Sequence, residues 1–173
     1  SLLSANSRNQ IRRSYKELAG PVTVNAARDA AQIEEWLEAM RQLNAGRHAD
    51  NAWDSKNFRD FARTICVNGL ANDETELLEV RGGEAVIGYL LNFKYPGRAM
   101  NYQSAFAAPI GPKSKPGLIC HAAAVAHYAA QPFSVYSLLA GKDRYKQSLS
   151  TGAEQMEWWT GERFAWRLEA EAL

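Results

Sequence analysis

Apolar residues recur at helical spacing through much of the first seventy residues, with one short alternating stretch between them. Residues 6–18 place three apolar side chains on a narrow stripe, which predicts a helix that ends at the Gly-Pro pair 20–21. Residues 21–26 alternate apolar and polar side chains and contain Val and Thr, which predicts a strand. Residues 29–45 and 54–70 return to the helical period and predict two consecutive helices.

The pattern changes after residue 72 to long runs of strand-forming residues separated by glycine-rich turns. Residues 75–81, 84–95 and 99–107 each favour a strand. They are separated by Gly-Gly at 82–83 and by Pro-Gly-Arg at 96–98, both of which are typical turn sequences. We therefore expect an antiparallel meander of three strands.

The last third of the chain mixes the two periods. Residues 110–131 begin as a Gly/Pro/Lys loop and continue as an alanine-rich helix. Residues 133–139 predict a strand and 143–149 a short helix, followed by two strands at 155–160 and 163–168. The expected buried face of the alanine-rich helix consists of Leu118, Ala122, Val125 and Ala129.

This order of elements indicates the fold class. Helices alternate with strands in places, and hairpins occur elsewhere, which favours a mixed, largely antiparallel sheet flanked by helices, an α/β (α+β) arrangement. The chain has 173 residues, of which 46% are hydrophobic and 23% charged, as is ordinary for one globular domain.

Charge and cysteine content exclude several classes of protein. The net charge of +1 gives no overall field that would favour nucleic acid or an anionic membrane, and the basic residues of 8–16 predict a solvated or interface face. The two cysteines, Cys66 and Cys120, lie in apolar surroundings and predict buried free thiols. No apolar run approaches the roughly 18 residues of a membrane helix, and the amino end is polar and then basic, so we expect a cytoplasmic protein.

Four segments resemble the CelD/BcsL-type proteins of the GNAT acyltransferase superfamily, which are associated with bacterial polysaccharide biosynthesis. The order of elements is that of GNAT folds, and the matching segments are SRNQIRRSYKEL, GEAVIGYLLNFKYPGRAMNYQSAF, KPGLICHAAAVAHYA and LLAGKDRYKQSL. The resemblance covers residues 6 to about 169. It implies a connector helix at 1–20 and a GNAT-like domain at 21–173, the carboxyl half of a longer protein with an upstream GNAT-like half.

The resemblance implies acetyl-CoA or a longer acyl-CoA as cosubstrate, held between two strands that diverge. These strands correspond to residues 100–107 and 133–139. The polar or amphipathic residues that we expect to face the gap, by alternation, are Tyr102, Gln103 and Ser104. Ordinary packing of these residues within the sheet is the alternative.

The loop before the alanine-rich helix contains a candidate pyrophosphate site. A helix amino terminus supplies backbone N–H donors and a favourable dipole, and nearby lysines add positive charge. The residues concerned are Gly111, Lys113, Lys115 and Gly117. A flexible surface turn with two solvated lysines is the alternative, and the loop lacks the usual GNAT spacing Q/R-x-x-G-x-G/A.

The charged cluster after Gly141 contains the candidate catalytic residues. The resemblance assigns Tyr145 to protonation of the leaving thiolate. We expect Lys146 to stabilise developing negative charge, or to hold a phosphate or an anionic acceptor. A capped helix with a half-buried tyrosine and a solvated lysine is the structural alternative. His121 and His127, six residues apart, do not share a helix face; we expect packing or surface roles for them and no metal site.

The sequence thus predicts an N-acyltransferase in which an amine, amino sugar or polysaccharide precursor attacks the thioester directly. A Fem-like transferase that uses aminoacyl-tRNA is an alternative, although it should carry a stronger basic charge than +1. A non-catalytic GNAT-like binding module is another, because Ser137 replaces an aspartate found in many relatives.

Overall fold

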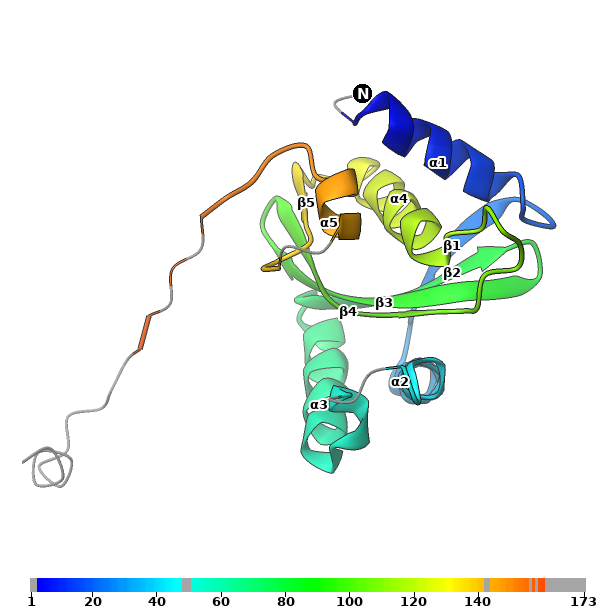
Figure 1. Ribbon diagram of the computed structural model, residues 1–173. Coiled ribbons are helices and arrows are strands. Elements are labelled where there is room, and N and C mark those ends of the chain that lie inside the picture. Colours follow the sequence, from blue (N-terminus) through cyan, green and yellow to red (C-terminus); the bar gives the residue numbers. More distant parts are fainter. Residues whose placement is uncertain (1–2, 48–50, 142–143, 156, 158, 161–173) are drawn as a thin grey trace, which may run out of the picture.

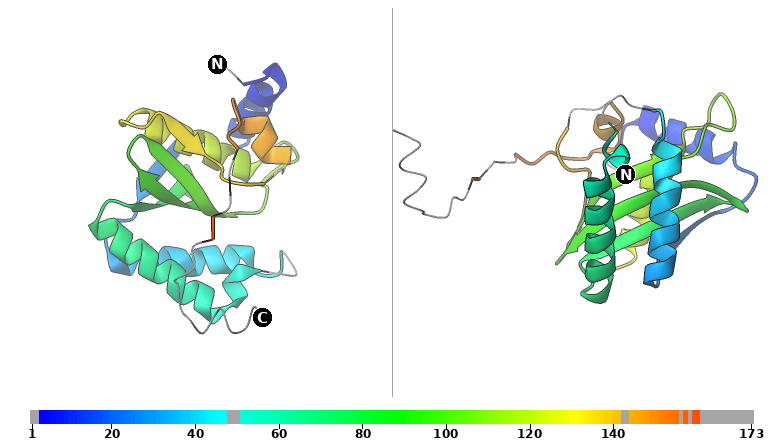
Figure 2. Two further views of the ribbon diagram at one scale, coloured as in Figure 1. Left: turned by 90° about the vertical axis from the view of Figure 1, so that its left-hand side faces the viewer. Right: turned by 90° about the horizontal axis from the view of Figure 1, so that it is seen from below.

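The computed structural model describes residues 3–47, 51–141, 144–155, 157 and 159–160. A five-stranded sheet in the order β1-β2-β3-β4-β5 forms its centre. Helices α2 and α3 cover one face of this sheet, and α1, α4 and α5 lie on the other (Figures 1 and 2). The predicted fold class, a mixed and mostly antiparallel sheet between helices, is confirmed.

The elements of the first seventy residues lie close to the predicted positions. They are α1 (Ala5–Tyr15), β1 (Val22–Ala26), α2 (Ala30–Asn44), a short 3-10 turn η1 (Ala52–Asp54) and α3 (Lys56–Ala71). Asp29 and Ser55 begin α2 and α3 because their side-chain oxygens accept hydrogen bonds from the otherwise unpaired N–H groups of Gln32 and Phe58.

The meander is confirmed as β2 (Thr75–Gly82), β3 (Ala85–Tyr95) and β4 (Arg98–Phe106), each antiparallel to its neighbour. Both connecting turns contain a glycine in the left-handed region, Gly83 with φ +61° and Gly97 with φ +74°. Glycine adopts this conformation without the steric cost that a Cβ atom would bring. The two turns predicted from the sequence therefore connect the strands of the hairpins.

Alternation along the strands divides the apolar residues between two cores. Leu77 pairs with Leu91 and faces the core under α2 and α3, which also contains Trp36. Leu78 pairs with Leu90 and faces the core under α4. Both cysteines are buried free thiols, as predicted.

Helix α4 (Pro116–Ala129) buries a different face from the one predicted. Leu118 is buried, but Val125 is 47% exposed and Ala129 is also exposed. The side chains in the core include Ile119, Cys120, Ala123, Ala124 and Tyr128. Almost every position of this helix is apolar, so spacing alone does not distinguish its faces; contact with the sheet does.

The carboxyl part departs further from expectation. Strand β5 spans only Val135–Ser137, because Leu139 at φ +55° breaks the extended chain, and α5 follows at Arg144–Leu149. The strand predicted at 155–160 is wrong for its described residues, which are irregular, and the one at 163–168 lies outside the described residues. Strand-forming composition does not supply a pairing partner, and pairing decides whether a strand forms. Among the described helices, none is long and apolar enough to cross a membrane.

Candidate functional site

Strands β4 and β5 run in parallel for three residue pairs and then part. The carbonyl of Gly97 accepts hydrogen bonds from Ser134 N at 2.8 Å and Val135 N at 3.1 Å, which ties the start of β5 to β4. The last pair is Met100 with Ser137, whereas β4 continues to Phe106. Within the described residues the β5 side of β4 therefore has no strand partner after Met100, and a fork opens in the sheet.

A bulge in β4 lies at this fork. Gln103 pairs with Leu91 and Asn101 with Asn92, which leaves Tyr102 as an extra residue. Asn101 Nδ2 donates to Asn92 Oδ1 at 3.1 Å, and Ser104 Oγ donates to Asn101 Oδ1 at 2.8 Å. Both asparagines are buried, and a buried amide without partners costs about 1–3 kcal/mol, so this network stabilises the bulge.

The bulge changes where the predicted gap-facing residues point. Simple alternation across 102–104 does not hold, because the extra residue shifts the period. Tyr102 packs toward α3, with its ring centroid 5.1 Å from Phe93, 6.3 Å from Phe61 and 6.5 Å from Phe58. The Ser104 hydroxyl is used in the bulge network. At the fork, residues 102–104 therefore expose the backbone edge of β4.

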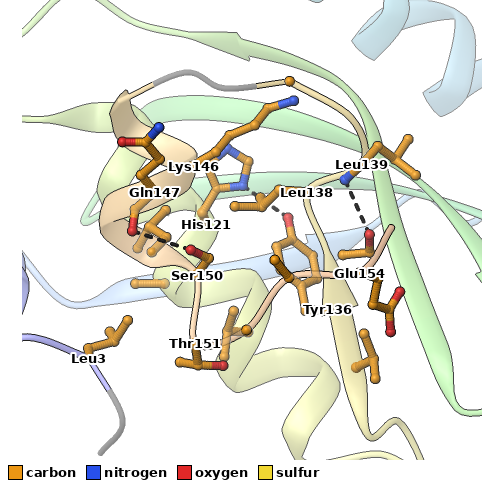
Figure 3. Close-up of a pocket in the computed structure, with 18 of the residues that line it drawn as sticks. Leu3, His121, Tyr136, Leu138, Leu139, Lys146, Gln147, Ser150, Thr151 and Glu154 are labelled. Atoms are coloured by element: carbon orange, nitrogen blue, oxygen red, sulfur yellow. Dashed lines mark hydrogen bonds between the residues drawn. The ribbon is translucent and has the colours of Figure 1, made fainter. Parts of the chain in front are cut away.

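On the opposite face of the sheet, β5, α4 and α5 enclose a pocket of about 1130 Å³ (Figure 3). Leu3 and Ile11 contribute to its wall from the amino-terminal segment, and residues 150–154 close another side. Arg98 at the start of β4 holds Glu154 of this segment through two hydrogen bonds, of 2.7 and 2.9 Å. Of the predicted site residues, all of which the structure describes, only Lys146 lines the pocket.

His121 is the residue that the sequence reasoning did not select and that the structure places centrally. It is 1% exposed and lines the pocket. Its ring centroid lies 5.7 Å from that of Phe106 on β4 and 6.1 Å from that of Tyr136 on β5, so the imidazole spans the two strands of the fork. Tyr145 stacks on it at 5.6 Å and 12°. His121 is one of two histidines in the alanine-rich helix, and that sequence signal carried no information about the strands above which the side chain would lie.

The imidazole is held neutral. Burial, with a smaller contribution from the Lys146 ammonium, lowers the pKa of His121 to about 4. Nδ1 lies 3.0 Å from the Tyr136 hydroxyl, whose pKa is raised by burial. The buried Nε2 atom has no hydrogen-bond partner among the described residues. In Figure 3, Tyr136 and Lys146 lie beside this ring.

Helix α5 brings the two predicted catalytic side chains to the same place. Tyr145 is 42% exposed and reaches the fork through its stacking on His121. Lys146 donates a hydrogen bond from Nζ to the carbonyl of Ala140, which fixes the ammonium near the end of the β5–α5 connection. Tyr145 and Lys146 therefore both lie near the neutral imidazole of His121, and of these two Lys146 lines the pocket.

The predicted pyrophosphate loop lies at the other end of this face, at the start of α4. Lys115 has no side-chain cap interaction with the helix, and Gly117 packs so closely on Phe106 that an added Cβ would lie 3.0 Å from the ring. Lys115 Nζ donates to Gln10 Oε1 at 2.8 Å, and the Lys113 carbonyl accepts from Ser14 Oγ at 2.9 Å. Helix α1 therefore packs directly against this loop.

A further feature of the loop concerns Gly111. An added Cβ there would collide with the carboxylate of Glu17, so an acidic group lies against the loop.

Among the described residues, no cluster of three His, Cys, Asp or Glu side chains could hold a metal ion.

The family model described as an acetyltransferase (GNAT) domain matches residues 5–147 of this chain. No curated protein sequence matches it. The solved structures that share its fold include the following three. A possible acetyltransferase from Clostridium difficile 630 has 6% identity and a TM-score of 0.54, covering 83% of this chain and 99% of its own. A predicted acetyltransferase with acetyl-CoA from Clostridium acetobutylicum has 16% identity and a TM-score of 0.50, covering 83% and 96%. An aminoglycoside acetyltransferase from an uncultured soil metagenomic sample, in complex with sisomicin, has 14% identity and a TM-score of 0.51, covering 83% and 97%.

The match extends from α1 through the meander, the fork and α4 into α5, whereas Leu3 and residues 150–154 of the pocket wall lie outside it. The chain belongs to the GNAT acetyltransferase domain family.

Proposed function

We propose that this protein transfers an acetyl or longer acyl group from acyl-CoA to a primary amine by direct attack of the amine on the thioester. The observation that carries the proposal is the fork between β4 and β5, since strands paired along their whole length would leave no unpaired edge for the donor. The unpaired edge at 102–104 offers backbone N–H and C=O groups to the amide-containing pantetheine arm.

In this proposal the start of α4 binds the pyrophosphate of the donor, and side chains of α5 act at its sulfur. The backbone of Gly111 and Gly117, with Lys113 and Lys115, binds the pyrophosphate at the start of α4. Tyr145 donates its phenolic proton to the sulfur as the C–S bond breaks, and the ammonium of Lys146 stabilises the negative charge that develops there. The amine gives its proton to solvent water as the new C–N bond forms, and the Tyr145 phenolate then takes up a proton from solvent.

The acceptor that we propose is an amine on a sugar or a polysaccharide precursor, as in a CelD/BcsL-like protein. The four sequence segments that resemble that group support this assignment. The structure with sisomicin also shows that a protein of this fold accommodates an aminoglycoside.

A second candidate is a GNAT-like module that binds a ligand without transferring an acyl group. Two features favour it. Ser137 stands at the end of β5, where the resemblance leads us to expect an aspartate, so that carboxylate is missing. The Glu17 carboxylate lies against Gly111, and its negative charge would repel a bound pyrophosphate.

Thermal unfolding with acetyl-CoA and longer acyl-CoAs separates the two candidates. At a ligand concentration about 100-fold above Kd, binding stabilises a protein by about 2.7 kcal/mol, which raises Tm by several degrees in a chain of this size. Binding together with CoA release in the presence of amino sugars supports the transferase. Absence of any shift with every acyl-CoA would overturn it.

The pyrophosphate assignment has its own test. The double variant Lys113→Ala, Lys115→Ala should weaken CoA binding by about 5- to 10-fold at low salt, because two cations near the phosphates are lost. Lys56→Ala is the matched control, since Lys56 is an exposed lysine on α3, on the other face of the sheet. Equal CoA affinities of the double variant and the control would refute the assignment.

A further inference from the structure

The Nε2 atom of the His121 imidazole lies on a buried side chain at the pocket wall. The side chain is 1% exposed, and the described residues offer Nε2 no hydrogen-bond partner. Buried polar atoms are nearly always paired in folded proteins, so an orphaned one that lines a pocket indicates a partner supplied by a ligand. Strand β5, which forms one side of the fork in which the donor is proposed to bind, also lines this pocket.

The hydrogen bond to Tyr136 sets which nitrogen carries the proton. The phenol remains protonated because burial raises its pKa. Among the described atoms the recorded hydrogen-bond partner of its hydroxyl is His121 Nδ1, at 3.0 Å. When the hydroxyl donates to Nδ1, the proton of the neutral imidazole lies on Nε2. The free nitrogen is therefore a donor, and its partner must be an acceptor.

The neighbours of the ring indicate which acceptor this is. His121 contacts Phe106 from β4 and Tyr136 from β5, on either side of the fork, and stacks on Tyr145. Tyr145 is the residue that the proposed function places at the thioester sulfur. The acceptor that we infer for Nε2 is therefore this sulfur, approaching the rings from the fork.

We propose that neutral His121 donates a hydrogen bond from Nε2–H to the sulfur of the acyl donor and stabilises the thiolate as it leaves. The inference rests on the proposed function and adds a second group at the sulfur. The amine nitrogen forms a bond to the carbonyl carbon and loses a proton to solvent water, the C–S electron pair moves to sulfur, and Tyr145 supplies the proton that sulfur takes up. His121 keeps its own proton throughout, so it is a hydrogen-bond donor and not the base.

The test compares CoA with desulfo-CoA, which lacks the sulfur, in the wild-type protein and in His121→Phe. The ionisation of bound CoA is followed by the ultraviolet absorbance of the thiolate as pH is raised. The wild type should hold bound CoA with an approximately tenfold larger thiolate fraction at a given pH than the variant does, since a hydrogen bond to an ionised group is a strong one. Desulfo-CoA should bind both proteins equally.

A second measurement requires no substitution. In the wild-type protein labelled with ¹⁵N-histidine, CoA should shift the Nε2 resonance of His121 and desulfo-CoA should not. Equal thiolate fractions in the two proteins, or identical Nε2 shifts with both ligands, would overturn the role of His121 and leave the proposed function standing. Failure of the wild type to bind either ligand would overturn the proposed function and this inference together.

Discussion

The buried neutral imidazole should make the fold sensitive to acid. The pKa of His121 is about 4 in the folded protein, against an ordinary value of 6.5. The unfolded chain therefore takes up a proton between these two values while the folded protein does not, and stability falls as pH decreases through that window. The loss approaches about 3 kcal/mol near pH 4, at 1.36 kcal/mol for each unit of the difference.

Three groups around the ring enter this prediction: the Tyr136 and Tyr145 phenols and the Lys146 ammonium. The phenols stay neutral in acid, and the ammonium opposes a second positive charge, so each leaves the sign unchanged. The pKa of Glu76 is also lowered, so protonation of Glu76 reduces the stability of the fold at still lower pH. This loss is the same in the wild type and in a variant without His121.

Urea unfolding at several pH values between 7.5 and 4.5 measures the effect, with His121→Phe as the comparison. Wild-type stability should fall by about 2–3 kcal/mol more than that of the variant over this range. The difference in slope is the result that matters, because the substitution also changes stability at neutral pH. Parallel pH profiles for the two proteins would refute the reasoning.

Three further substitutions have expected outcomes that the structure sets. Tyr145→Phe should lower kcat by about 10²- to 10⁴-fold while the Kd of acyl-CoA is unchanged, because it removes the proposed proton donor; unchanged turnover would exclude this role. Gly88→Ala places a Cβ 2.6 Å from the Ala105 carbonyl and should cost about 1–3 kcal/mol in urea unfolding, whereas Gly152→Ala, with open space around it, should cost little; equal values would contradict this packing. Asn101→Ala removes the amide at the centre of the bulge and should lower Tm by several degrees, and an unchanged Tm would show that the network is dispensable.

The sequence predicted the helices and strands of residues 5–106 because local features determine them. Asp29 and Ser55 cap helices through their own side chains, and Gly83 and Gly97 adopt turn conformations that other residues resist. Such signals act over a few residues, so they can be read without knowledge of the rest of the chain.

Prediction failed where a long-range contact decides between local alternatives. The buried face of α4 could not be identified because apolar residues surround the helix, and contact with the sheet selects Ile119 and Cys120 over Val125. Residues 155–160 have strand-like composition, but their described members have no strand pairing.

For the site, the sequence by itself indicated two classes of group, a phenol and an ammonium on one short helix, together with a strand order that allows a fork. Only the tertiary structure decided that β5 separates from β4 after three residue pairs and that His121 lies over this separation. The physical reason is that strand registry and side-chain burial depend on residues far apart in the chain. Phe106, His121, Tyr136 and Tyr145 come from four different elements, and folding brings the other three rings into contact with the imidazole.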